Sequence, residues 1–155
     1  MFLDTENFKF IVKNTPLVSI DLIVQSNDDQ FLLGKRTNRP ARGFWFVPGG
    51  RVQKDETLDD AFIRLTRNEL GIEIHRDVAS FMGVYEHMYS DNFSEDNFTT
   101  HYIVIAYKIV VDSNDISYPL EQHSSYTWMH RTDILSGSNI HYNTLAYFYD
   151  IERDG

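Results

Sequence analysis

The sequence contains no cysteine, which excludes a disulfide framework and any metal site built on thiolates. Basic residues are also few: 14 Lys and Arg stand against 23 Asp and Glu, for a formal net charge of −9. A surface of that charge repels a long phosphate backbone unless its basic residues cluster. We therefore expect no nucleic-acid partner.

Long apolar runs are missing as well. None approaches the roughly 20 residues that cross a bilayer, and residues 1–6 lack the basic and apolar regions of a secretory signal peptide. Together with the absence of cysteine, this predicts a soluble cytoplasmic protein with no membrane partner. The 155 residues, 42% of them hydrophobic, suit one domain, 1–155, around one sizeable core.

Hydrophobic periodicity and turn residues divide the chain into elements. Helices are predicted at 4–14, about 57–70 and 143–151, with a helical turn at 131–135. Strands are predicted at 17–25, 31–36, 78–88, 98–111 and 126–130. Loops are predicted at 37–50, at 112–123 and at 90–96, the last being polar and expected to be mobile. Strands and helices mix without regular alternation, which favours an α+β fold over a doubly wound sheet.

The stretch around the second helix is the most informative part of the chain. It opens as a loop at two glycines, Gly49 and Gly50. Thr57 suits the N-cap of the following helix, and Gly71 suits its C-terminal stop. Apolar residues then recur with helical spacing on one face: Leu58, Ala61, Phe62 and Leu65.

Glu69 falls on that apolar face, between Leu65 and Ile72. A carboxylate there is costly unless a metal ion or a cationic partner compensates it. The alternative is a helix-end carboxylate paired with Arg64 or Arg67. Because the preceding loop offers backbone carbonyls and amides, the stretch predicts a site that holds a cation and, through it, phosphates.

Basic residues do cluster at one place, shortly before this helix: Lys35, Arg36, Arg39, Arg42 and Arg51. Guanidinium groups match phosphate oxygens in pairs, although solvation at the surface is the usual fate of an arginine. A pocket-sized anion such as a nucleotide derivative fits this cluster better than nucleic acid does.

The helix and its loop carry a recognisable signature. Nudix hydrolases share a Gly, five residues, Glu, seven residues, then Arg-Glu-apolar-any-Glu-Glu-any-Gly-apolar. This chain supplies the following residues at that spacing: Gly50, Glu56, Arg64, Glu69, Gly71 and Ile72. Two of the signature's glutamates are replaced, by Leu65 and by Asn68. The chain, with its box at 50–72, thus resembles a Nudix hydrolase.

The two replacements resemble one branch of that family, the GDP-mannose mannosyl hydrolases. Further segments are similar to that branch: 15–21, 31–40, 45–53, 99–102 and 121–123. The resemblance covers nearly the whole chain and implies an α/β/α sandwich around a mixed β-sheet. It also implies a homodimer with one Mg²⁺ per subunit, for which Mn²⁺ can substitute.

The resemblance implies a ligand set for that ion. Mg²⁺ prefers hard oxygen donors and keeps several waters and substrate phosphates in its shell. The implied ligands are the Glu69 carboxylate, the Gly49 carbonyl and the Gln122 amide. The resemblance also implies an ion pair between Glu56 and Arg64, whose role is to fix the loop against the helix.

The helix has lost two carboxylates, yet a hydrolase still needs a group that takes a proton from water. Histidine titrates near neutrality, and His123 follows the implied ligand Gln122 on a predicted loop. We expect His123 to be the general base, although most histidines are only solvated or hydrogen-bonded. The competing bases are His87 and His101, and His87 has the alternative role of a substrate contact.

Other residues have a functional and an ordinary interpretation. The resemblance assigns Arg36 to the leaving diphosphate, and Arg51 could face the same pocket. Asp21 interrupts an apolar strand, either on its exposed face or as a group that binds sugar hydroxyls or stabilises a cationic sugar carbon. Tyr102 could hydrogen-bond the diphosphate or pack in the core.

Near the N-terminus, the residues Phe2, Leu3 and Phe8 would ordinarily be core or dimer contacts. In the branch that this chain resembles, the aromatic residues there help to hold guanine. The implied partner is therefore a small nucleotide sugar.

Three functions follow. The first is hydrolysis of GDP-mannose, with GDP-glucose as a possible second substrate, by attack of water at the anomeric carbon with inversion. The second is a pyrophosphohydrolase that attacks phosphorus and gives GMP and a sugar 1-phosphate; Leu65 and Asn68 count against it. The third is a domain that only binds nucleotide sugars, against which stand the intact Glu69, Gln122 and His123.

Overall fold

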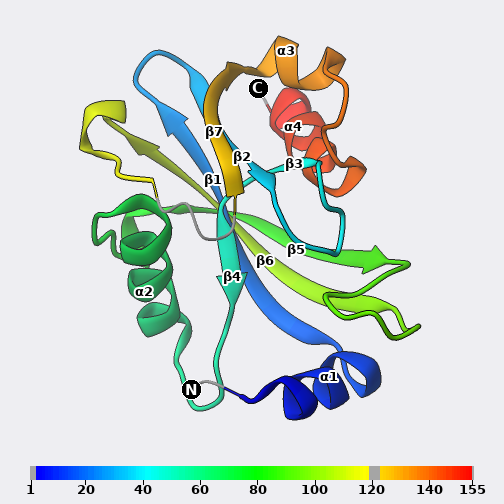
Figure 1. The fold of residues 1–155 in the computed structure, drawn as a ribbon. Helices are drawn as coiled ribbons and strands as arrows, with labels where there is room; N and C mark the ends of the chain where they lie inside the picture. Colours follow the sequence, from blue (N-terminus) through cyan, green and yellow to red (C-terminus); the bar gives the residue numbers. More distant parts are fainter. Residues whose placement is uncertain (1–2, 119–122, 155) are drawn as a thin grey trace.

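The computed structural model describes residues 3–118 and 123–154, with the backbone alone for 123–124 and 152–154. Figure 1 shows the elements along the chain. The helices are α1 (Thr5–Asn14), α2 (Leu58–Leu70), α3 (Arg131–Ser136) and α4 (Tyr142–Asp154), with short 3-10 turns η1 (Arg76–Val78) and η2 (Ser113–Asp115). The strands are β1 (Leu17–Ser26), β2 (Gln30–Arg36), β3 (Trp45–Phe46), β4 (Gly49–Arg51), β5 (Ser80–Tyr89), β6 (Thr100–Val111) and β7 (His123–His130). None of the described helices is long and apolar enough to cross a membrane.

The strands form one mixed sheet in the order β3-β2-β1-β6-β5, with β4 paired to β1 and β7 paired to β2. β1 and β6 run parallel over ten residue pairs, from Leu17 opposite Tyr102 to Ser26 opposite Val111. The other pairings are antiparallel. The predicted α+β class with a mixed sheet is confirmed.

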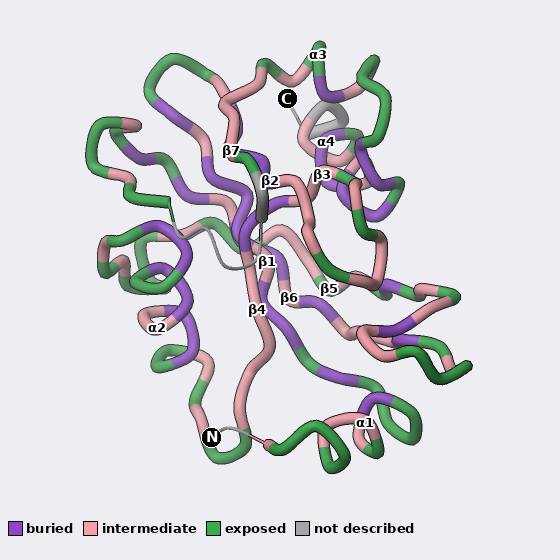
Figure 2. The backbone as a smooth tube through the Cα atoms, in the orientation of Figure 1, coloured by how far each residue is buried: buried purple, intermediate pink, exposed green. Residues whose placement is uncertain are grey.

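Helices cover both faces of this sheet. Alternate residues of β1 point to opposite sides, so Ile20 and Leu22 pack with α2, whereas Ile23 packs with α3 and α4. Figure 2 shows the buried backbone concentrated in the central strands and on the inner side of α2. The sheet is therefore the middle layer between two helical layers, and α1 lies at one end of it (Figure 1).

Local rules explain α2. Thr57 Oγ1 accepts a hydrogen bond from the Asp60 amide at 3.1 Å, and Gly71 ends the helix in the left-handed conformation with φ 76°. Leu65 is buried on the inner face, and Glu69, one turn further along the same face, is only 3% exposed. The predicted helix, its caps and the burial of Glu69 are all found.

Three segments differ from the prediction. The loop expected at 37–50 contains β3 and β4, because Trp45–Phe46 pairs with β2 and Gly49–Arg51 pairs with β1. Strands of two or three residues carry no periodicity, so only their distant partners reveal them. β7 begins at His123, which places that residue's backbone in a strand rather than a loop.

The segment 90–96, which we expected to be mobile, is folded around a buried side chain instead. The amide nitrogen of Asn92 donates to the carbonyls of Asp96 and Phe98 at 2.9 and 2.7 Å. Its amide oxygen accepts from the Ser94 backbone at 2.7 Å. Asn92 is 1% exposed, so a polar sequence here encodes an internal hydrogen-bond network.

Candidate functional site

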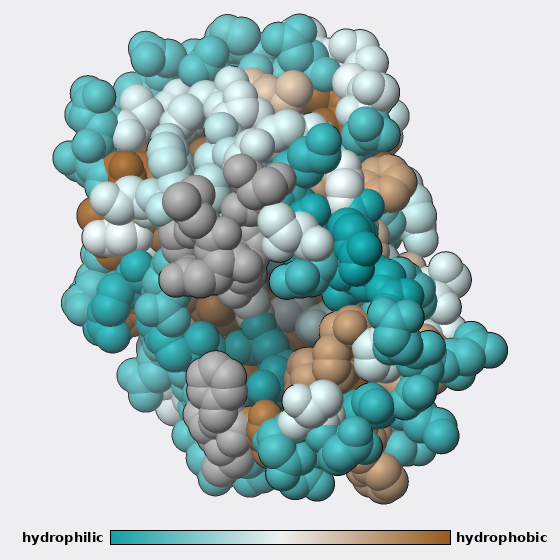
Figure 3. Space-filling view, viewed as in Figure 1, coloured by the Kyte–Doolittle hydropathy of each residue, from teal (hydrophilic) through white to brown (hydrophobic). Residues whose placement is uncertain are grey.

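A pocket of about 260 Å³ lies where β1, β4, β5 and β6 meet. Figure 3 shows a hollow near the centre of the face drawn in Figure 1, with hydrophilic residues beside it. Six of the expected site residues line the pocket: Asp21, Arg36, Gly49, Arg51, His87 and Tyr102. The remaining lining residues are Ser19, Pro40, Phe46, Val47, Gly50 and Tyr89.

Strand register explains why distant residues meet here. Ser19 and Asp21 are two apart on β1 and so share a face, and Gly49 of β4 pairs directly with Asp21. His87 of β5 stands opposite Tyr102 of β6. The pocket is thus held by rigid strands on several sides.

Two arginines give the pocket its positive charge. Arg36 is fixed by its Nε, which donates to the Pro40 carbonyl at 2.9 Å and the Asn38 carbonyl at 3.3 Å. Its guanidinium also lies 5.7 Å from the centre of the Phe46 ring. Because these contacts hold the side chain through Nε and the ring, its terminal NH₂ groups are the donors suited to a bound anion.

Asp21 is the acidic group among the described residues that line the pocket. Burial raises the pKa of its carboxyl group to about 7, while a hydrogen bond from Tyr147 and the positive charge of Arg36 act in the opposite direction. Tyr147 Oη donates to Asp21 Oδ2 at 2.6 Å. Asp21 therefore faces inward, and its exposed-face interpretation is wrong.

His87 is 5% exposed, and its Nε2 lies 3.2 Å from Tyr147 Oη. Burial, with a contribution from His141, lowers the pKa of His87 to about 4. The ring is therefore neutral near pH 7 and too weakly basic to be a well-matched general base. Its alternative role, a contact to substrate, fits its place in the pocket wall.

Tyr102 also lines the pocket. Burial raises the pKa of its phenol, opposed by the charges of Arg36 and Arg51. The hydroxyl is therefore protonated near neutral pH and can donate a hydrogen bond to an anion.

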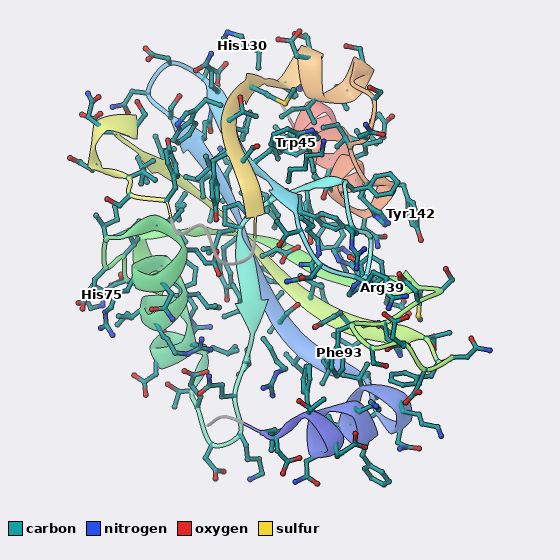
Figure 4. The ribbon with its side chains drawn as sticks, in the orientation of Figure 1. Arg39, Trp45, His75, Phe93, His130 and Tyr142 are labelled. Carbon is teal, nitrogen blue, oxygen red and sulfur yellow. The ribbon has the colours of Figure 1, made fainter. Side chains whose placement is uncertain are left out.

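Three other histidines, His75, His101 and His130, lie away from the pocket. Figure 4 shows His75 beyond α2 and His130 at the end of β7, both at the periphery of the molecule. His101 follows Thr100 on β6, next to Tyr102, so its side chain points to the opposite face of the sheet. It does not line the pocket.

The backbone of His123 stands opposite Arg36 in the pairing of β2 with β7, which brings its position close to the pocket. Gln122 and Phe2 lie outside the described residues. Their expected roles as metal ligand and guanine contact stay predictions.

The glycine loop and α2 offer oxygen donors to a metal ion. A Cβ at Gly49 would lie 2.4 Å from the Ile20 carbonyl and 2.6 Å from Asp21 Oδ1, and a Cβ at Gly50 would lie 2.5 Å from Leu65. At Gly49, where the neighbour is a backbone carbonyl, only glycine permits this close packing of loop and strand. Among the described residues, no group of three or more acidic, histidine or cysteine side chains could hold a metal. The donors that remain are hard oxygens, the Glu69 carboxylate and the Gly49 carbonyl, a set that fits Mg²⁺ completed by water and substrate.

Glu56 and Arg64, which we expected to pair, lie in bidentate contact. Arg64 Nε and Nη2 donate to the two carboxylate oxygens of Glu56 at 2.6 and 2.9 Å. Arg64 Nη2 also donates to the Arg51 carbonyl at 2.8 Å. The pair therefore ties α2 to both ends of the segment between β4 and the helix.

The N-terminal residues approach the site through Arg51. The guanidinium of Arg51 lies 5.1 Å from the centre of the Phe8 ring, which packs on Phe93 at 5.0 Å. Figure 4 shows Phe93 above α1. Leu3 lines a separate cavity of about 650 Å³ to which Arg51 also contributes. Arg51 thus stands between the pocket and the N-terminal segment.

The sequence did not single out Tyr147, Tyr89, Phe46 or Ser19. Tyr147 lies at helical spacing from Asn143 and Thr144, so all three are on the inner face of α4. From the sequence alone, that face is an ordinary core face. Tyr89 and Phe46 are aromatic residues in strand-like segments. No local signal distinguishes them from core residues.

Comparisons with known proteins place this chain in a family. The model of the NUDIX domain matches residues 15–148. The low-salt glycan biosynthesis protein Agl8 of Haloferax volcanii is 40% identical over 119 residues, 77% of this chain and 74% of Agl8. The ADP-ribose pyrophosphatase of Methanocaldococcus jannaschii is 40% identical over 70 residues, 45% of this chain and 40% of that protein.

Solved structures share the fold. The MutT protein from Methanosarcina mazei Go1 superposes with a TM-score of 0.72 at 22% identity, covering 91% of this chain and 96% of that one. The NUDIX domain of Shewanella oneidensis NrtR, complexed with ADP ribose, gives 0.69 at 15% identity, covering 98% and 99%. With the family match over 15–148, the chain belongs to the Nudix hydrolases.

Proposed function

We propose that this Nudix hydrolase converts GDP-mannose to GDP and mannose, with Mg²⁺ as cofactor. The observation that carries the proposal is the pocket itself, which sets Asp21 and His87 beside the cationic groups Arg36 and Arg51. A nucleotide sugar presents a diphosphate to the arginines and sugar hydroxyls to the other two side chains. Agl8, the relative named for glycan biosynthesis, is consistent with a sugar substrate.

The bond broken decides what the site must stabilise. In this proposal the water oxygen bonds to the anomeric carbon, and the electron pair of the bond to the diphosphate leaves with GDP. The sugar carbon becomes positive while the diphosphate gains negative charge. Arg36, Arg51 and the neutral phenol of Tyr102 stabilise that leaving charge. Asp21 stabilises the cationic carbon or binds the sugar hydroxyls.

Glu69 and Gly49 would hold the Mg²⁺, with Gln122 as the third implied ligand. When bound, the ion supplies further positive charge to the leaving diphosphate. α2 offers little for a second ion: Leu65 is packed against Gly50, and Asn68 is exposed. Attack on phosphorus usually draws on more carboxylates, so this helix favours attack at carbon.

The proton released by the attacking water goes to His123 in this proposal. A positioned base contributes typically 10²–10⁴-fold to the rate. His123→Gln should therefore lower kcat by about that factor and leave Mg²⁺ binding close to normal. His101→Gln is the control, because that side chain points to the other face of the sheet. Equal activity of wild type and His123→Gln would place the base elsewhere.

Hydrolysis in ¹⁸O-labelled water tests the reaction. The label is expected in mannose, and the mannose should first appear with inverted configuration. Label in a phosphate, with GMP as product, would support attack at phosphorus, the reaction class of the relative named ADP-ribose pyrophosphatase. Tight GDP-mannose binding without turnover in Mg²⁺ would support a binding domain. A panel that includes GDP-glucose defines the preferred sugar, and the same assays with Mn²⁺ test its substitution.

The same proposal includes the assembly. Phe8 lies under Arg51 and Leu3 lines the adjoining cavity, which supports a contact between the N-terminal segment and the guanine end of the substrate. A homodimer is proposed with it. Light scattering at assay concentrations gives the oligomeric state, and Phe8→Ala should raise KM for GDP-mannose more than it lowers kcat.

A further inference from the structure

A buried tyrosine joins two groups of the pocket from behind. Tyr147 is fully buried on α4 and is not part of the pocket wall. Its hydroxyl oxygen lies 2.6 Å from Asp21 Oδ2 and 3.2 Å from His87 Nε2. Asp21 and His87 both line the pocket, on β1 and β5, so one hydroxyl connects two strands across its inner end.

The hydrogen bonds have a definite direction. A tyrosine hydroxyl carries one proton, and Tyr147 donates its own to Asp21 Oδ2. Its oxygen is then left to accept the proton on His87 Nε2, 3.2 Å away. Burial keeps the His87 ring neutral by lowering its pKa, so a proton on Nε2 leaves Nδ1 as an acceptor.

We propose that Tyr147 is a positioning residue that keeps Asp21 and His87 as hydrogen-bond acceptors at the sugar end of the pocket. It holds the Asp21 carboxylate in place and fixes His87 in the tautomer whose Nδ1 accepts a hydrogen bond. The inference rests on the proposed function, because the group that donates to these two acceptors is then a hydroxyl of the sugar. The pocket thereby selects sugars that have hydroxyls at the matching positions.

The selection has a physical basis. A site built to hydrogen-bond a hydroxyl rejects an analogue that lacks it, because the polar groups of the site are then left unpaired. Without the Tyr147 hydroxyl, the His87 ring is free to change tautomer and present a donor instead of an acceptor. Discrimination between sugars should therefore fall more than the ability to bind the diphosphate.

The tautomer can be measured directly by ¹⁵N NMR of histidine-labelled protein at a pH where the His87 ring is neutral. The His87 signals are assigned by their loss in His87→Gln. In the wild type we expect a protonated Nε2 and an unprotonated Nδ1, and in Tyr147→Phe a mixture of the two tautomers. A wild-type proton on Nδ1 would overturn the proposal even if the variant failed to fold.

Tyr85→Phe is the matched control. The Tyr85 hydroxyl donates to Asp150, and its ring packs edge-on against Tyr147 at 4.7 Å between centroids. The control removes the hydroxyl that donates to Asp150 and leaves the Tyr147 hydroxyl in place, so the tautomer of His87 should not change. A change of equal size in both variants would show a general packing effect and contradict the proposal.

Kinetics supply the second readout. Tyr147→Phe should lower kcat/KM for GDP-mannose about 10- to 100-fold, and should lower it much less for GDP-sugars that lack one hydroxyl. Equal losses for every sugar would refute a role in selection. Because the NMR measurement needs no turnover, it still decides the role of Tyr147 if GDP-mannose proves not to be the substrate.

Discussion

Arg64 donates hydrogen bonds from Nε and Nη2 to the two carboxylate oxygens of Glu56, and its Nη2 also donates to the carbonyl of Arg51. One guanidinium therefore connects three points: the helix α2, the loop before it and the end of β4. Both side chains are mostly buried, with 25% and 13% of their surfaces exposed. Removing one member leaves the other charged and poorly solvated, which is costlier than losing an exposed pair.

The first prediction concerns the stability of this junction. Arg64→Lys keeps the charge but cannot make the bidentate contact, so the free energy of unfolding should fall by about 1–3 kcal/mol. Arg67 pairs with the exposed Glu73, so Arg67→Lys should lower the free energy of unfolding by about 1 kcal/mol or less. Urea unfolding measures both. Equal effects of the two substitutions would mean that Arg64 does not organise the loop.

The same pair makes stability depend on pH. The hydrogen bonds from Arg64 hold the pKa of Glu56 below its ordinary value of 4.5. A depressed carboxyl pKa contributes stability above the unfolded-state value, and that stability is lost as the pH falls through the folded-state value. Glu56→Gln should therefore remove part of the acid sensitivity below pH 4.5. If Glu56→Gln loses stability at acid pH as steeply as wild type, the acid sensitivity does not come from Glu56.

The second prediction concerns Asp21 and His87, whose contributions to stability change with pH in opposite directions. His87, with its pKa lowered from 6.5 to about 4, contributes up to about 3 kcal/mol of stability that is present above pH 6.5 and lost as the pH falls toward 4. Asp21, with its pKa raised from 3.8 to about 7, acts with the opposite sign. Its contribution of up to about 4 kcal/mol is present below pH 3.8 and lost as the pH rises through 7.

Replacing one of these two residues should reveal the pH dependence of stability that is due to the other. Asp21→Asn keeps an acceptor for Tyr147 and should be more stable than wild type above about pH 8, with stability that falls more steeply toward acid. His87→Gln should instead gain stability, relative to wild type, as the pH falls from 6.5 toward 4. Thermal unfolding across this range measures both, with the exposed His75→Gln as control. Parallel pH curves for all four proteins would refute the two assignments.

Local chemistry made part of this fold predictable. α2 was found from its caps and its apolar spacing because Thr57, Gly71 and Leu65 act on neighbours within a few turns. Asp21 was singled out because it interrupts an apolar strand, Arg36 because the resemblance assigns it to the diphosphate, and the glycine loop because glycine breaks regular structure. By contrast, β3 and β4 are set by pairing with β2 and β1, which lie outside these two short segments, and no pattern within two or three residues reports such pairing.

The Tyr147 contact shows the same limit at the site. Tyr147 and Asp21 are 126 residues apart, and each taken alone has an ordinary explanation on its own element. A tyrosine on the inner face of a terminal helix reads as core, and it is indeed buried. Only the three-dimensional fold shows that its hydroxyl also meets the acid and the histidine of the pocket.

The third prediction concerns the metal. Glu69→Gln keeps the shape of the side chain but removes its charge, so Mg²⁺ binding should weaken and turnover should fall by orders of magnitude. Calorimetry with Mg²⁺ and an activity assay measure the two effects. Glu73→Gln is the control, since Glu73 is exposed just beyond the same helix. Near-normal turnover in Glu69→Gln would remove Glu69 from the metal site.

The last prediction concerns the leaving group. Arg36 is held through Nε by the Pro40 carbonyl and lies over Phe46, so its terminal nitrogens are positioned before substrate arrives. Negative charge on the diphosphate grows toward the transition state, and a group prepared for it stabilises the transition state more than the ground state. Arg36→Gln should therefore lower kcat more than it raises KM.

Arg36→Lys separates charge from geometry. Lysine restores the positive charge but neither the Nε contact nor the paired donors, so it should recover only part of kcat. Arg42→Gln is the matched control, because Arg42 belongs to the same basic cluster but does not line the pocket. It should leave kcat nearly unchanged. If Arg36→Gln changes KM alone, Arg36 anchors the substrate without assisting departure of the diphosphate, and the stabilising charge must come from Arg51 and the metal.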